Sequence, residues 1–188
     1  MTWTIPNILT VLRLLAAPLL PLAYYLLPHP AADWAAVLLF VGASATDWVD
    51  GYLARKWNQT SRFGAMLDPI ADKAMVLIAL LLVVALFDMP ALLTLAATLI
   101  VFREVFVSGL REFLGARAGQ LKVTKLAKWK TTVQMVALTV LLAHGIAMPA
   151  LAQALGTGLL LIAAGLTLIT GADYFAKAWP YLCDGDEK

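Results

Sequence analysis

The chain has 188 residues, of which 62% are hydrophobic and only 14% are charged, and its mean hydropathy is +0.83. A typical soluble domain carries about 25% charged residues, so this composition excludes a soluble globule and predicts an integral membrane protein. The formal net charge of +2 gives no support to a nucleic-acid partner. A single cysteine excludes both a disulfide framework and a cysteine-based metal site.

Apolar stretches separated by short polar or proline-containing breaks predict six membrane helices, because one span takes roughly 20 residues. The fifth stretch is short unless its helix starts near Lys125. The predicted spans are Ile8–Leu27, Trp34–Ala54, Ala65–Phe87, Ala91–Leu110, Thr131–His144 and Leu151–Tyr174. The expected fold is therefore an all-α integral membrane protein with six transmembrane helices, in which residues 1–188 form a single transmembrane domain.

The charges of the connecting segments predict the orientation in the membrane. The breaks near residues 28–33, 88–90 and 144–150 contain neither Lys nor Arg. Most basic residues lie between the second and third helices and between the fourth and fifth: Arg55, Lys56, Arg62, Arg111, Arg117, Lys122, Lys125, Lys128 and Lys130. By the positive-inside rule these segments face the cytoplasm. Both termini are then cytoplasmic, and the expected location is the inner (cell) membrane.

Four aspartates lie at the predicted cytoplasmic ends of the second and third helices. Asp47 and Asp50 are three residues apart and Asp68 and Asp72 are four apart, so each pair shares one helix face. Carboxylates this close to hydrocarbon are costly and repel one another unless a cation holds them. Clustered oxygen ligands suit Mg²⁺ or Mn²⁺, and four carboxylates are enough for two such ions. The sequence therefore predicts a metal site here.

The residues between the two pairs fit a site for a phosphate-bearing ligand. Gly51 and Ala54 leave space beside the carboxylates, and Gly64 lets the chain enter the third helix tightly. Arg55 can fork onto phosphate oxygens. Aspartates of this kind also occur at solvated helix ends and in the ion sites of cation-coupled transporters. A transporter more commonly shows interrupted helices or repeated halves, and neither is visible in the sequence.

The whole pattern Asp47-x2-Asp50-Gly51-x2-Ala54-Arg55-x8-Gly64-x3-Asp68-x3-Asp72 resembles the signature of the CDP-alcohol phosphotransferases, with no departure in spacing. The resemblance implies transfer of a phosphatidyl group from a CDP-linked lipid to an alcohol, with release of CMP. It implies that all four aspartates hold two metal ions and that Asp72 is the general base. It also implies that the region of Asp50, Gly51, Ala54 and Arg55 contacts the CDP moiety, and that the enzyme is a homodimer.

The acceptor alcohol has to be inferred from basic residues further along the chain. Arg103, Arg111 and Lys128 can form a pocket for an anionic acceptor, although a basic cytoplasmic loop also explains lysines in this region. An arginine at the depth of Arg103 needs a partner, either Glu104 or a substrate phosphate. A phosphorylated acceptor fits this cationic set better than serine does, and inositol phosphate stays an alternative.

The segments Arg103-Glu104-x6-Arg111-Glu112 and Lys128-x-Lys130-Thr131-Thr132-x-Gln134 are similar to the bacterial phosphatidylglycerophosphate synthases, with Ala127 as a departure where glycine is expected. So is Pro6-Asn7-x2-Thr10-x2-Arg13. The resemblance implies transfer from CDP-diacylglycerol to sn-glycerol 3-phosphate, with Arg103, Arg111 and Lys128 on the acceptor phosphate. Asn7, Thr10 and Arg13 are expected to line the cytoplasmic rim and to help hold the nucleotide, with helix capping and snorkelling as alternatives.

Overall fold

The computed structural model describes residues 4–56, 61–115 and 125–183, and the side chains of all of these except 48–56 and Lys125. The described residues form helices and no strand. The helices are α1 (Ile5–Leu26), α2 (Ala31–Lys56), α3 (Arg62–Leu86), α4 (Ala91–Leu114), α5 (Lys125–Leu142), the short 3₁₀ helix η2 (Ala143–Gly145) and α6 (Pro149–Cys183). The predicted all-α class and the six α-helices are confirmed, and α5 does start at Lys125.

Two compact units make up the structure. The first comprises Met1–Asp88 with Leu138–Gly156, and the second comprises Met89–Ala137 with Thr157–Lys188. The first unit therefore contains α1, α2, α3 and η2, and the second contains α4 with most of α5 and α6. That the whole chain forms one domain stays a prediction.

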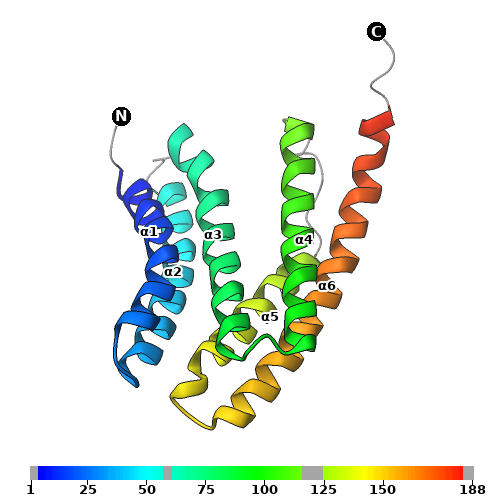
Figure 1. The fold of residues 1–188 in the computed structure, drawn as a ribbon. Coiled ribbons are helices and arrows are strands. Elements are labelled where there is room, and N and C mark those ends of the chain that lie inside the picture. Colours follow the sequence, from blue (N-terminus) through cyan, green and yellow to red (C-terminus); the bar gives the residue numbers. More distant parts are fainter. Residues whose placement is uncertain (1–3, 57–60, 116–124, 184–188) are drawn as a thin grey trace. The chain divides into compact units, whose positions relative to one another are not determined.

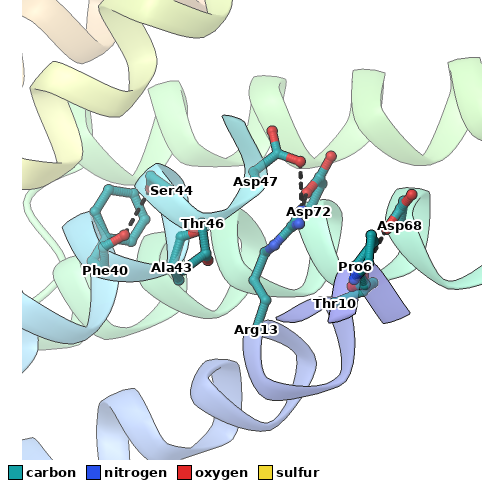
Figure 2. A network of polar contacts seen from close by, with 10 residues as sticks. All are labelled: Pro6, Thr10, Arg13, Phe40, Ala43, Ser44, Thr46, Asp47, Asp68 and Asp72. Atoms are coloured by element: carbon teal, nitrogen blue, oxygen red, sulfur yellow. Dashed lines mark hydrogen bonds and ion pairs between the residues drawn. The ribbon is translucent and has the colours of Figure 1, made fainter. Parts of the chain in front are cut away.

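In the first unit, α1 packs against both α2 and α3 (Figure 1). One face of α1 makes these contacts, because its buried residues recur at intervals of three and four, the spacing of one helix face. These residues are Asn7, Thr10, Arg13, Ala17, Leu20 and Tyr24, and Pro6 next to Asn7 is buried as well. The first half of the face is polar and the second half is apolar. The polar half lies at the same end of the unit as Asp47, Asp68 and Asp72 (Figure 2).

At the other end of the first unit, the buried carboxylate of Asp33 stabilises the start of α2. The side chain of Asp33 is 2% exposed, and its Oδ2 lies 2.8 Å from His29 Nδ1. The Tyr24 ring packs edge-on against His29, with 5.1 Å between the ring centroids. This end is held by polar and aromatic contacts that are separate from the aspartate run.

The second unit is held by contacts from α4 to α5 and α6. Phe106 of α4 packs on Phe175 of α6, with ring centroids 5.6 Å apart. Arg103 of α4 passes close to Gly171 of α6, where a Cβ atom would lie 3.0 Å from Arg103 Cγ. Glu104 of α4 bonds to Lys130 of α5. The long apolar helices of this unit therefore enclose a charged cluster.

Four of the described helices, α1, α3, α4 and α6, are long and apolar enough to cross a bilayer. The helix α2 falls short because Asp33, Asp47 and Asp50 interrupt its apolar run, and α5 falls short because it begins with three lysines among its first six residues. Six helices are thus present, whereas six membrane spans stay a prediction. The orientation of the termini also stays a prediction.

Candidate active site

Three of the four predicted aspartates have described side chains, and polar residues of α1 contact all three (Figure 2). One guanidinium nitrogen of Arg13, NH1, donates to Asp47 Oδ1 at 2.6 Å and also to Asp72 Oδ1. Thr10 Oγ1 donates to Asp68 Oδ1 at 2.7 Å and lies 3.0 Å from the carbonyl oxygen of Pro6. The aspartates of α2 and α3 are therefore connected by hydrogen bonds to a third helix, α1.

The exposed fractions show which side of this cluster is open. The Arg13 side chain is 2% exposed, whereas the side chains of Asp47 and Asp72 are 51% and 49% exposed. The cation is thus enclosed, and the carboxylates that it contacts are half-exposed. Snorkelling of Arg13 to a surface is wrong, because its guanidinium turns to the two carboxylates inside the unit.

A second polar contact ties α1 to the start of α3. Ser61 caps α3, since its Oγ accepts from the backbone N–H of Gly64 at 2.9 Å, and the same hydroxyl donates to Asn7 Oδ1 at 2.8 Å. A Cβ atom at Gly64 would lie 2.6 Å from Asn7 Oδ1. The absence of a side chain at Gly64 therefore permits the close approach of Asn7, which agrees with the tight entry into this helix that the sequence predicts.

Four predicted site residues lie outside the described side chains: Asp50, Gly51, Ala54 and Arg55. The helical backbone of α2 runs through all four positions, which follow Asp47 directly. Their expected contacts with CDP, and the share of Asp50 in a metal site, stay predictions.

The ligand atoms available at this site are of the type that binds divalent cations. They are carboxylate oxygens, which Mg²⁺ and Mn²⁺ prefer, and two of them already share one cationic group. Among the side chains that the structure describes, no group of three or more carboxylates, imidazoles or thiols is placed to hold a metal ion. Asp68 turns to Thr10 while Asp47 and Asp72 turn to Arg13.

The three residues expected to bind the acceptor phosphate all belong to the second unit, where each has different surroundings. Arg103 NH1 donates to Glu104 Oε1 at 3.0 Å, which confirms Glu104 as a partner for that arginine. The guanidinium of Arg111 lies over the ring of Tyr174, 5.3 Å from its centroid. Lys128 is exposed at the start of α5.

Among the lysines of this region whose side chains the structure describes, Lys130 is buried. Its Nζ donates to Glu104 Oε1 at 2.6 Å, and its side chain is 7% exposed. Arg103, Glu104 and Lys130 together carry two positive charges and one negative charge. The sequence indicates a basic segment here, but it does not indicate which lysine turns inward, because that depends on the position of Glu104 on another helix.

The contact of Arg13 with the aspartates was also missed from the sequence. A signal for it exists, since Asn7, Thr10 and Arg13 are spaced three apart and share one face of α1. A lone cation on that face of an apolar helix requires an anionic partner. The aspartate run is the main concentration of carboxylates in the same unit.

Known proteins resemble this chain over nearly its whole length. A CDP-diacylglycerol–glycerol-3-phosphate 3-phosphatidyltransferase of Cereibacter sphaeroides is 53% identical over 98% of this chain and 99% of its own. Proteins of the same name are 45% identical in Pseudomonas fluorescens, over 95% of this chain and 91% of their own, and 40% identical in Escherichia coli, over 98% and 100%. The family model described as CDP-alcohol phosphatidyltransferase matches residues 3–170. The chain belongs to the CDP-alcohol phosphatidyltransferase family.

Proposed function

We propose that this protein transfers the phosphatidyl group of CDP-diacylglycerol to sn-glycerol 3-phosphate, which gives phosphatidylglycerol phosphate and CMP. The geometry supports the reaction class through one observation: Asp47 and Asp72, from two helices, both bond to one buried arginine and are themselves half-exposed. The acceptor follows the names of relatives that are 40–53% identical over at least 95% of this chain.

In the proposed reaction, the 1-hydroxyl oxygen of glycerol 3-phosphate attacks the lipid-side phosphorus of the pyrophosphate. A new phosphorus–oxygen bond forms, the bond to the bridging oxygen breaks, and CMP leaves with that oxygen. The hydroxyl proton passes to Asp72, the proposed general base. A carboxylate has two acceptor oxygens, so an Asp72 that holds Arg13 through Oδ1 still has Oδ2 for the proton.

The same aspartates are proposed to hold two divalent cations, Mg²⁺ or Mn²⁺: Asp47, Asp50, Asp68 and Asp72. Such ions, when bound, neutralise the charge that develops on the pyrophosphate as CMP leaves. Arg13 would keep the carboxylates of Asp47 and Asp72 near each other, and Thr10 would hold the carboxylate of Asp68. The CDP-lipid is proposed to lie against Asp50, Gly51, Ala54 and Arg55.

Asn7, Thr10 and Gly64 are proposed to form the α1 and α3 side of the CDP-lipid site. Their support is the contact network at the start of α3, in which Asn7 lies against Gly64 and bonds to Ser61. Thr10 bonds to Asp68 in the same network. A substitution at any of these three positions would therefore alter the surroundings of Asp68, a proposed metal ligand.

The acceptor phosphate is proposed to bind Arg103, Arg111 and Lys128. A guanidinium stacked on a ring, as Arg111 is on Tyr174, keeps its in-plane N–H groups available to phosphate oxygens. Arg103 shares Glu104 with Lys130, which leaves this cluster with one net positive charge for a dianionic acceptor.

Six spans, cytoplasmic termini and a cytoplasmic-facing site in the inner membrane complete the proposal, together with a homodimer. The supporting pattern is that the basic residues of the connecting segments cluster near the same helix ends as the aspartates. A soluble phosphate from the cytosol and a nucleotide-linked lipid in the bilayer can meet at such an interface.

The test supplies purified protein with CDP-diacylglycerol, Mg²⁺ or Mn²⁺, and separate labelled alcohols: glycerol 3-phosphate, inositol phosphate and serine. We expect label from glycerol 3-phosphate in lipid, with one CMP released per product. Incorporation of another alcohol in its place would refute the acceptor and leave the family membership intact. Without metal-dependent CMP release for any of these alcohols, the proposed reaction itself would be refuted.

A further inference from the structure

The Arg13 side chain is a buried cation in a helix that is otherwise apolar enough to span a membrane. Only 2% of it is exposed, so its charge is removed from water and must be compensated inside the protein. The compensation comes from two carboxylates on two different helices, Asp47 of α2 and Asp72 of α3. Such an arrangement is costly to build for packing alone, since an apolar residue would fill the same space without desolvating a charge.

The geometry of the contact constrains both carboxylates at once. A single nitrogen, NH1, bonds to the Oδ1 atoms of Asp47 and Asp72. Two oxygens that share one hydrogen-bond donor lie within roughly 6 Å of each other, twice the length of such a bond. Without the guanidinium between them, two like charges at that separation would turn apart. Arg13 therefore fixes the distance between one carboxylate of each pair.

The same contact separates Arg13 from the proposed substrates. The guanidinium is enclosed, whereas about half of each carboxylate side chain, 51% for Asp47 and 49% for Asp72, is exposed. A phosphate that approaches from solvent can reach the exposed parts of the carboxylates, but the guanidinium is not open to it. The expectation that Arg13 helps to hold the nucleotide directly thus fits the structure less well than a role behind the ligands.

We propose that Arg13 is a positioning residue of the metal site: it holds the carboxylates of Asp47 and Asp72 at the spacing at which they bind divalent cations. This inference rests on the proposed function, because it assigns Arg13 a role toward the same four aspartates. Residues that orient metal ligands typically contribute 10–100-fold to metal affinity or activity. Arginine suits the role, since its NH1 has two N–H groups, one for each carboxylate, and the guanidinium stays charged when buried, whereas a buried lysine loses its proton more readily.

The experiment measures Mn²⁺ binding to the purified protein by electron paramagnetic resonance, without substrate, for wild type, Arg13→Gln and Arg13→Lys. The control is Lys177→Gln, which removes an exposed cation from an i,i+4 ion pair on α6. We expect Arg13→Gln to weaken Mn²⁺ binding by about 10-fold or more, Arg13→Lys to lie between it and wild type, and Lys177→Gln to bind as wild type does. Unchanged or tighter binding by Arg13→Gln overturns the proposal, because Arg13 would then only balance or oppose the metal charge.

Kinetics at saturating metal give the second measurement. A positioning residue predicts a lower kcat with a KM for CDP-diacylglycerol within about twofold of wild type. An increased KM with normal kcat would overturn the proposal in favour of direct nucleotide binding. If Arg13→Gln does not fold, Arg13→Lys decides: Mn²⁺ affinity equal to wild type overturns the proposal, and weaker affinity with a normal melting temperature supports it. Absence of CMP release by wild type would refute the proposed function instead, and the Mn²⁺ series would still be readable.

Discussion

Gly64→Ala is the most local test of how α1 and α3 fit together. The added Cβ would lie 2.6 Å from Asn7 Oδ1, which accepts a hydrogen bond from Ser61 at 2.8 Å. An ordinary carbon–oxygen contact is about 3.3 Å or longer, so Asn7 has to move away by roughly 0.7 Å. That movement strains or breaks the bond to Ser61, and it disturbs α3 one turn before Asp68.

The expected cost follows from opposing contributions. Loss of the Asn7–Ser61 hydrogen bond costs about 1 kcal/mol, and overpacking at such a contact costs about 1–3 kcal/mol. Alanine is favoured over glycine by up to about 1 kcal/mol in a helix interior and by less in the first turn. We therefore expect a net loss of about 1–4 kcal/mol, which lowers Tm by about 2–16 °C for a chain of this size.

The assay is thermal unfolding of the purified protein in detergent, with Gly109→Ala as the matched control. No atom lies within 4 Å of a Cβ built at Gly109, so this substitution should leave Tm unchanged or raise it. Asn7→Ala removes the opposing oxygen, and in that background Gly64→Ala should cost less than it does alone, as a double-mutant cycle would show. A Tm for Gly64→Ala at or above that of Gly109→Ala would refute the proposed close approach.

Three further outcomes are expected. Asp72→Asn should lower kcat by about 10²–10⁴-fold, the usual contribution of a general base, and should also lower Tm, because the buried Arg13 loses one of its two anionic partners; near-normal CMP release would exclude Asp72 as the base. Chelation of divalent cations with EDTA should abolish CMP release, and added Mg²⁺ or Mn²⁺ should restore it; full turnover in EDTA would rule out the metal requirement. Glu104→Gln should destabilise the protein by about 3–5 kcal/mol, because it leaves Arg103 and Lys130 charged and enclosed without their shared anion, and the double variant Glu104→Gln/Lys130→Met should recover part of that loss. Equal denaturant midpoints for the single and double variants would show that the pair is not coupled.

The positions of the helices were predictable because they depend on local composition. The end of the sixth helix was predicted wrongly because charged residues were taken to mark the end of the helix. The sixth helix was predicted to end at Tyr174, but α6 continues to Cys183. Asp173 and Lys177 form an i,i+4 ion pair at 2.7 Å, a contact that stabilises a helix in water. The charged residues of this part of α6 indicate that the helix continues into water, and they do not mark its end.

The positions of the aspartates in the site were predictable from the sequence, but the contacts between distant segments of the chain were not. The spacing of the aspartates gives their helix faces, and the resemblance to the family signature implies their roles, which stay predictions. The partner of Arg13 depends on how α1 lies against α2 and α3, across 34 and 59 residues of sequence. Periodicity places Asn7, Thr10 and Arg13 on one face, but it does not say which helix that face meets.

The face of α1 explains why the first helix belongs to the site although it carries none of the aspartates. Its apolar half, which includes Ala17 and Leu20, is fully buried and packs within the first unit. Its polar half continues the same packed face toward the aspartates. The packing of the apolar half therefore also fixes the positions of Thr10 and Arg13 on the helix. A rigid helix can hold donors at constant spacing without a loop that must be ordered first. The three helices thus act together: α2 and α3 carry the carboxylates, and α1 sets the distance between them.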